Sequence, residues 1–280
     1  MRVIRYEDIV AQVKELCLDA NCTLPMDVFE ALVEAQKKEE SPLGQNVLDA
    51  ILENAKIAKE KKMPLCQDTG LVVVFAEVGQ DVRIEGGLLS EAVDEGVRQA
   101  YQEGYFRMSV VGDPLERVNT KDNTPAVLHV SLVAGDKLRL QVAPKGFGSE
   151  NMSALKMLKP ADGVQGIKDF VVKAVSEAGG NPCPPIIIGV GIGGTMEKAA
   201  LLAKRALLRE VGSRHPKPHV ARLEEELLEL VNKTGVGPQG FGGTQTALEL
   251  FVEVYPTHIA GLPVAVNINC HVARHGEAVL

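Results

Sequence analysis

The sequence lacks the features that mark a nucleic-acid-binding protein or a membrane protein. Its net charge is −7, and its lysine cluster at positions 56, 59, 61 and 62 is short enough to be a solvated helix end, so a nucleic-acid partner is disfavoured. No apolar run approaches the ~20 residues that a membrane span requires, and residues 1–8 lack the apolar core of a signal peptide. We therefore expect a cytoplasmic protein with no membrane partner.

The composition of a disulfide-stabilised protein is also absent. Five cysteines are an odd number, and without an export signal they are better interpreted as reduced thiols or metal ligands. The 280 residues, 45% hydrophobic and 24% charged, suit a globular protein. Because no linker, repeat or low-complexity tract interrupts them, we expect one domain over 1–280, with a helical region at 1–62 and an α/β region at 63–280.

Hydrophobic periodicity and turn residues predict the elements of this domain. Helices are expected at 6–19, 26–39, 42–61, 89–103, 163–178, 196–210 and 222–232, with Ser41 as an N-cap and Pro42 at the first helical position of the third. Strands are expected at 71–78, 127–133, 138–143, 184–190, 247–254 and 263–269. Gly135-Asp136 predicts a hairpin between the second and third strands. The fold class is therefore α/β (mixed α+β), with a mixed β-sheet covered by helices.

Three cysteines, Cys66, Cys183 and Cys270, each stand where a loop joins an apolar run. Their wide spacing excludes a zinc finger or a ferredoxin-like run, whose ligands lie a few positions apart. Only the fold could bring them together at a metal, and from spacing alone each could equally be a buried thiol. Cys17 is interpreted as a core residue of the first helix, and Cys22 has no motif around it.

Polar neighbours favour a site near two of these cysteines. Gln67 and Asp68 follow Cys66 and supply an amide and a potential general base, while His271, Arg274 and His275 follow Cys270. Such groups are costly to bury without a purpose, although ordinary loop hydrogen bonding remains an alternative for the two histidines. Arg107, flanked by apolar residues, suits a carboxylate clamp or a structural ion pair.

Glycine-rich runs allow a second interpretation. Gly189, Gly191 and Gly194 match G-x-G-x-x-G between a predicted strand and helix, which favours a nicotinamide-binding unit, but no second strand ends in an acidic residue about 20 positions later. Similar runs occupy 145–152 and 235–244. Their backbone N–H groups could bind anions, or the glycines could only permit tight turns.

Several motifs together resemble one family. The segments Pro64-Leu-Cys-Gln-Asp-Thr-Gly70, Lys145-Gly-Phe-Gly-Ser-Glu-Asn-Met-Ser153, Cys183-Pro-Pro-Ile-Ile-Ile-Gly-Val-Gly-Ile-Gly-Gly194 and Asn267-Ile-Asn-Cys-His271 are similar to the α-subunit of iron–sulfur hydro-lyases, class I fumarase and L(+)-tartrate dehydratase. The resemblance covers essentially the whole chain. It implies a [4Fe–4S] cluster held by Cys66, Cys183 and Cys270, with one iron free of cysteine to bind substrate.

The same resemblance implies a small dicarboxylate substrate. Its contacts would be Gln67, Arg107, backbone N–H groups at Gly146 and Gly148, and His258, while Asp68 would take part in proton transfer. From the residues alone, His258 could equally be a structural residue of its turn.

Members of this family need a further catalytic domain, so we expect a separate β-subunit that carries it, in an α2β2 assembly. Fumarate hydration to L-malate is preferred because fumarate is the common central-metabolic substrate. Dehydration of L(+)-tartrate is the alternative within the family. A nicotinamide-dependent oxidoreductase using 189–194 and a non-catalytic iron–sulfur or scaffold protein are the alternatives from other classes.

Overall fold

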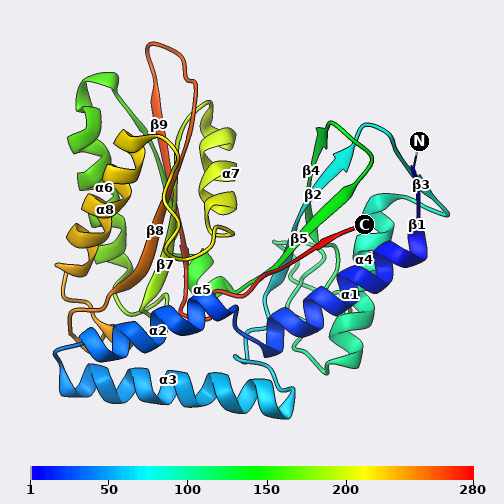
Figure 1. Cartoon of the computed structure of the whole chain (residues 1–280), viewed down its shortest axis with the longest axis horizontal. Helices are drawn as coiled ribbons and strands as arrows, with labels where there is room; N and C mark the ends of the chain where they lie inside the picture. The colour runs from blue at the N-terminus through cyan, green and yellow to red at the C-terminus, as the bar shows by residue number, and fades with distance from the viewer. Residues whose placement is uncertain (1) are drawn as a thin grey trace. The chain divides into compact units, whose positions relative to one another are not determined.

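The computed structural model describes residues 2–280 and has the expected mixed α/β fold (Figure 1). The chain forms two compact units. Unit 1 comprises Met1–Pro25, Asn54–Phe147 and Arg274–Leu280, and unit 2 comprises Met26–Glu53 and Gly148–Ala273. In residues 2–280, no helix has the length and apolar character needed to cross a membrane.

Unit 1 is a four-stranded sheet with two helices packed on it. The strands β2 (Leu71–Gly79), β4 (Val127–Val133), β5 (Leu138–Lys145) and β10 (Gly276–Val279) lie in the order β10-β5-β2-β4. Helices α1 (Tyr6–Cys22) and α4 (Leu89–Glu103) bury Val13, Cys17 and Val97 against the sheet residues Val74 and Leu140. A parallel pair, β1 (Arg2–Arg5) and β3 (Val82–Glu85), completes the unit.

The expected hairpin between residues 127–133 and 138–143 is wrong. Strand β2 lies between β4 and β5, parallel to the former and antiparallel to the latter. Because β2 is an almost wholly buried apolar run, it takes a central position where both of its edges are paired. The turn after β4 instead binds the chain just beyond β2, where Gln80 N–H donates to the Val133 carbonyl (2.8 Å).

Unit 2 contains the second sheet, in the order β6-β9-β7-β8. Its elements are α2 (Met26–Lys38), β6 (Ala154–Leu158), the 3-10 helix η1 (Pro160–Asp162), α6 (Gly163–Ala178), β7 (Ile186–Gly193), α7 (Met196–Ala206), α8 (Pro218–Asn232), η2 (Pro238–Gly240), β8 (Ala247–Tyr255) and β9 (Leu262–Asn269). Strand β7 is parallel to β8 and antiparallel to β9.

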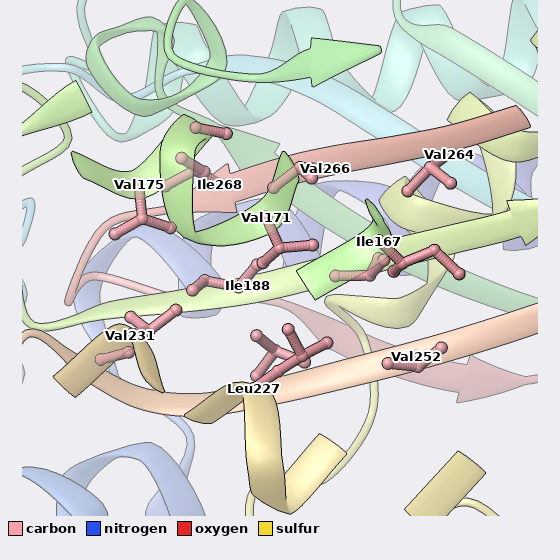
Figure 2. Close-up of a cluster of buried hydrophobic side chains, with 14 of the residues drawn as sticks. Ile167, Val171, Val175, Ile188, Leu227, Val231, Val252, Val264, Val266 and Ile268 are labelled. Atoms are coloured by element: carbon pink, nitrogen blue, oxygen red, sulfur yellow. The ribbon is translucent and has the colours of Figure 1, made fainter. Parts of the chain in front are cut away.

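Side chains of β7 alternate between two helical layers. One face carries Ile186, Ile188 and Val190 into a core with α6 and α8. Figure 2 shows Val171 of α6 and Leu227 of α8 directed toward this sheet. Helix α7 covers the opposite face, as Figure 1 shows, and its alanines pack on Ala265 of β9.

The helix positions agree closely with expectation, but the helical region does not stay together. Helix α3 (Pro42–Lys61) and the short α5 (Phe147–Glu150) complete the list of helices, and the predicted cap is present because Gly44 N–H donates to Ser41 Oγ (3.2 Å). Helix α1 belongs to unit 1 and α2 to unit 2. The boundary between the units therefore falls within the predicted helical region, and the expectation of one domain over 1–280 stays a prediction.

Candidate functional site

The segment between α3 and β2 holds Cys66 and Asp68 in a tight hydrogen-bonded turn. The Asp68 N–H donates to Cys66 Sγ (3.4 Å), and the Asp68 carboxylate accepts N–H bonds from Gly70 (3.0 Å) and Phe147 (2.8 Å). Cys66 and Asp68 are half-buried, and Gln67 is exposed. Because both carboxylate oxygens are held by backbone donors, the Asp68 side chain has a defined orientation on the turn that follows Cys66.

Arg107 lies against the same turn. The Thr69 hydroxyl donates to the Arg107 carbonyl (2.8 Å), which ties the Arg107 backbone to the residue after Asp68. The side chain is exposed, and no hydrogen bond or ion pair to its guanidinium is found within residues 2–280. The structural ion pair considered above is therefore absent from the described part of the chain, and the guanidinium remains available to a carboxylate.

The loop after β5 meets the Asp68 carboxylate through its backbone. Gly146 is half-buried, and a Cβ atom at this position would lie 3.2 Å from Asp68 Oδ2. Gly148 is exposed and belongs to unit 2, whereas Gly146 belongs to unit 1. The structure thus brings Gly146, but not Gly148, against the Asp68 side chain within unit 1.

In unit 2, Cys183 and Cys270 lie at one edge of the sheet. Cys183 precedes β7 and Cys270 follows the antiparallel β9, whose Asn269 pairs with Ile187. The His271 N–H donates to the Cys183 carbonyl (3.3 Å), and His271 Nδ1 lies 2.9 Å from the same oxygen. Cys183 has a φ of +56°, a backbone conformation that a non-glycine residue rarely adopts and that is common at functional sites.

Gln239, in the glycine-rich run at 235–244, binds the backbone next to Cys183. Its backbone N–H and its side-chain Nε2 both donate to the Pro184 carbonyl, each over 2.8 Å, and Nε2 also lies 3.2 Å from His271 Nδ1. His271 and Gln239 therefore hold the backbone around Cys183, and neither was assigned a site role from the sequence.

His258 occupies the opposite edge of the same sheet. It lies in the β8–β9 connection, where Gly193 at the end of β7 pairs with Tyr255. The eight residues of β7 separate the two edges by roughly 23 Å at about 3.3 Å per residue. His258 is exposed, and its Nδ1 accepts the Ala260 N–H (3.2 Å). Within unit 2, His258 is therefore not brought together with Cys183 and Cys270.

The G-x-G-x-x-G motif serves helix packing. Gly189 and Gly191 lie inside β7, and a Cβ atom on either would approach a carbonyl oxygen of α7 to 2.0 Å. A dinucleotide fingerprint instead places its glycines in the turn that holds the pyrophosphate. Close approach of α7 to β7 therefore accounts for these two glycines.

The candidate cysteines suit a metal cluster chemically. Burial raises the pKa of Cys17 to about 12, as expected for an inert core thiol. Cys66, Cys183 and Cys270 are instead half-buried, and the N–H···S bond to Cys66 is of the kind that tunes cluster sulfurs.

The three cysteines are distributed over both units. Cys66 lies in unit 1, whereas Cys183 and Cys270 lie in unit 2. Across residues 2–280, no group of three or more His, Cys, Asp or Glu side chains is arranged as a metal site. The assignment of all three to one cluster therefore rests on donor chemistry and on the motifs.

Comparisons with known proteins agree along nearly the whole chain. A model of the family described as Fumarate hydratase (Fumerase) matches residues 10–279. The chain is 47% identical to a Methanocaldococcus jannaschii protein named "Putative L(+)-tartrate dehydratase subunit alpha", over 97% of this chain and 96% of the relative. It is 34% identical to the L(+)-tartrate dehydratase subunit alpha of Escherichia coli strain UTI89, over 90% of this chain and 84% of the relative.

Proposed function

The chain belongs to the Fumarate hydratase (Fumerase) family, whose members are hydro-lyases, and we propose that it is the α-subunit of a [4Fe–4S] hydro-lyase acting on a four-carbon dicarboxylate. Dehydration of L(+)-tartrate is the favoured reaction, because the relatives above carry that name. The sequence alone favoured fumarate through a general metabolic argument, and the names of the relatives shift the preference to tartrate.

Fumarate hydration is the second candidate. It is favoured by the description of the family whose model spans residues 10–279. The two reactions share the chemistry required of the site, since each exchanges a proton beside a carboxylate and a hydroxyl on the next carbon. The two hydroxylated compounds, L-malate and L(+)-tartrate, differ by one hydroxyl group, so one set of residues in this chain could serve either reaction.

Cys66, Cys183 and Cys270 are proposed to hold the cluster, and the partial burial of all three side chains supports this role. When bound, a cluster with one iron free of cysteine supplies a Lewis acid for the leaving hydroxyl. His271 and Gln239 would then keep the Cys183 backbone in its unusual conformation, so that the sulfur approaches from a fixed direction.

The single observation that carries the proposal is the juxtaposition around Cys66. The Asp68 N–H is bonded to the Cys66 sulfur, and the Asp68 carboxylate is oriented by two backbone N–H groups. The Arg107 backbone is tied to the same turn, and its guanidinium has no hydrogen-bond or ion-pair partner within residues 2–280. Asp68 would move the proton, while Arg107 and Gln67 would bind substrate carboxylates.

The remaining predicted contacts have different support. A backbone N–H in the Gly146–Gly148 segment would stabilise charge on the substrate carboxylate, and Gly146 lies against Asp68. His258 stays a predicted substrate contact without support from unit 2, where it lies at the other edge of the sheet from Cys183.

A β-subunit is proposed to complete the enzyme. The relatives are named as alpha subunits, which supports a second chain that supplies the rest of the catalytic machinery. An α2β2 assembly is the proposed stoichiometry, and the three-cysteine set is this chain's contribution.

The decisive experiment is anaerobic co-expression with the companion β-subunit, followed by parallel assays. Oxaloacetate formation from L(+)-tartrate and malate formation from fumarate are measured on the same preparation. We expect turnover of tartrate at the higher kcat/KM, and we expect Asp68→Asn to lose activity while it keeps the visible absorption of the cluster. An iron-loaded complex that converts neither substrate would disprove the proposed function.

A further inference from the structure

The backbone carbonyls of three consecutive residues, Asp68, Thr69 and Gly70, are each bound by a buried side chain of unit 1. The Tyr101 hydroxyl donates to the carbonyls of Thr69 and Gly70, and Asn123 Nδ2 donates to Gly70 (3.1 Å). Arg274 Nη2 donates to the Asp68 carbonyl. Tyr101 and Asn123 are fully buried, and Arg274 is 3% exposed. Side chains distant in sequence therefore determine the backbone path of the turn that carries Cys66 and Asp68.

Arg274 also binds a second backbone segment. Its Nε donates to the Pro144 carbonyl (3.1 Å), two residues before Gly146. One guanidinium thus links the turn that carries Asp68 to the end of β5, from which the loop to Phe147 departs. The Asp68 carboxylate makes a second link between these two segments by accepting the Phe147 N–H (2.8 Å).

Arg274 is an unusual choice for structural support alone. Within residues 2–280 no carboxylate forms an ion pair with it, and its Nη1 is buried without a hydrogen-bond partner. A buried cation with no counter-ion lowers the stability of the protein. Its presence here therefore points to a role besides structural support. Arginine offers a rigid planar fork that can bind two carbonyls at a fixed separation, which the single ammonium of lysine cannot reproduce.

We propose that Arg274 is a positioning residue for the hydro-lyase reaction. It sets the distance between the Asp68 turn and the Gly146–Phe147 backbone, while Tyr101 fixes the carbonyls of Thr69 and Gly70. The proposal rests on the proposed function, since the groups it positions are the proton-transfer residue and the loop assigned to the substrate carboxylate. Arg274 acts through Asp68 and has no contact with the reacting atoms.

Two variants test this role in the co-expressed complex. Arg274→Lys keeps the charge but loses the fork, and Tyr101→Phe removes only the hydroxyl. Because a misplacement near 1 Å can cost on the order of a hundredfold in rate, we expect Arg274→Lys to lower kcat by about that factor with little change in KM. Tyr101→Phe should lower kcat less, in the same pattern. Arg139→Lys is the matched control, because Arg139 pairs with Glu277 on the exposed part of the same sheet.

Hydrogen–deuterium exchange provides a readout independent of turnover. Peptides covering residues 66–70 and 145–148 should exchange faster in Arg274→Lys, while peptides from β7 keep the wild-type rate. Wild-type exchange in both segments would overturn the proposal, and so would loss of the far-ultraviolet helical signal, which would make Arg274 structural. Failure of the proposed function is separable: the wild-type complex would be inactive on both substrates, whatever the exchange rates show.

Discussion

Glu39 is a buried carboxylate whose charge is satisfied entirely within unit 2. It is 2% exposed and accepts N–H bonds from Ser41 (2.9 Å), Thr244 (3.0 Å) and Gln245 (2.9 Å). Burial acts to raise the pKa of this carboxyl, but the backbone donors outweigh burial and hold the pKa below its ordinary value. A Cβ on Gly243 would lie 2.5 Å from Glu39 Oε1. The glycine-rich run at 235–244 therefore binds an anion that the chain itself supplies, the Glu39 carboxylate.

The lowered pKa of Glu39 predicts how the free energy of unfolding changes with pH. A carboxyl with a depressed folded pKa stabilises the protein above its unfolded pKa of about 4.3, and this contribution is lost as pH falls through the folded pKa. Glu39→Gln should therefore lower the free energy of unfolding by about 1–3 kcal/mol at pH 7, and the difference from wild type should shrink below about pH 4. Urea titrations of both proteins across this range measure it, with the exposed neighbour Glu40→Gln as control. A difference that grows on acidification would contradict the assigned cause.

Residues that support the site were harder to predict than residues expected to touch substrate. Asp68 stands in a recognisable motif and Arg107 is a cation flanked by apolar residues, and the structure ties the Arg107 backbone to the turn that carries Asp68. Tyr101 and Asn123 act on backbone carbonyls more than thirty residues away. A carbonyl is present at every position, so such a contact leaves no pattern in the sequence.

At the scale of elements, the packing of α7 on β7 depends on glycine. A Cβ at position 191 would approach the Ala199 carbonyl oxygen to 2.0 Å and the Ala203 nitrogen to 2.7 Å. Gly191→Ala must therefore push the helix away from the strand, and overpacking of this kind costs about 1–3 kcal/mol or more. The prediction is a lower unfolding midpoint, measured by circular dichroism, with Gly112→Ala unchanged because Gly112 is exposed and its nearest neighbours lie at 3.8 Å. Wild-type stability of Gly191→Ala would refute the packing explanation.

Local signals predicted the helices better than the sheets. Ser41 and Pro42 mark the start of α3, and Gly104 and Gly179 stand at the ends of α4 and α6, because caps act within a few residues of the bonds they satisfy. Strand order is set by pairing across the chain instead. Nothing near Gly135 indicates that β2 would separate β4 from β5. The strands β1, β3, β6 and β10 were missed because each is four or five residues long and only partly buried.

At the scale of the whole molecule, the five cysteines provide an internal comparison. Cys66, Cys183 and Cys270 are half-buried and assigned to the cluster, whereas Cys22 is equally half-buried with no such assignment. Serine at any of the first three removes a thiolate that iron requires, so each variant complex, purified anaerobically, should lose most of its iron and its visible absorption. Cys22→Ser should keep both, since its accessibility matches theirs and only its position differs. Iron retained in Cys183→Ser, or lost equally in Cys22→Ser, would show that the cluster is held by other groups.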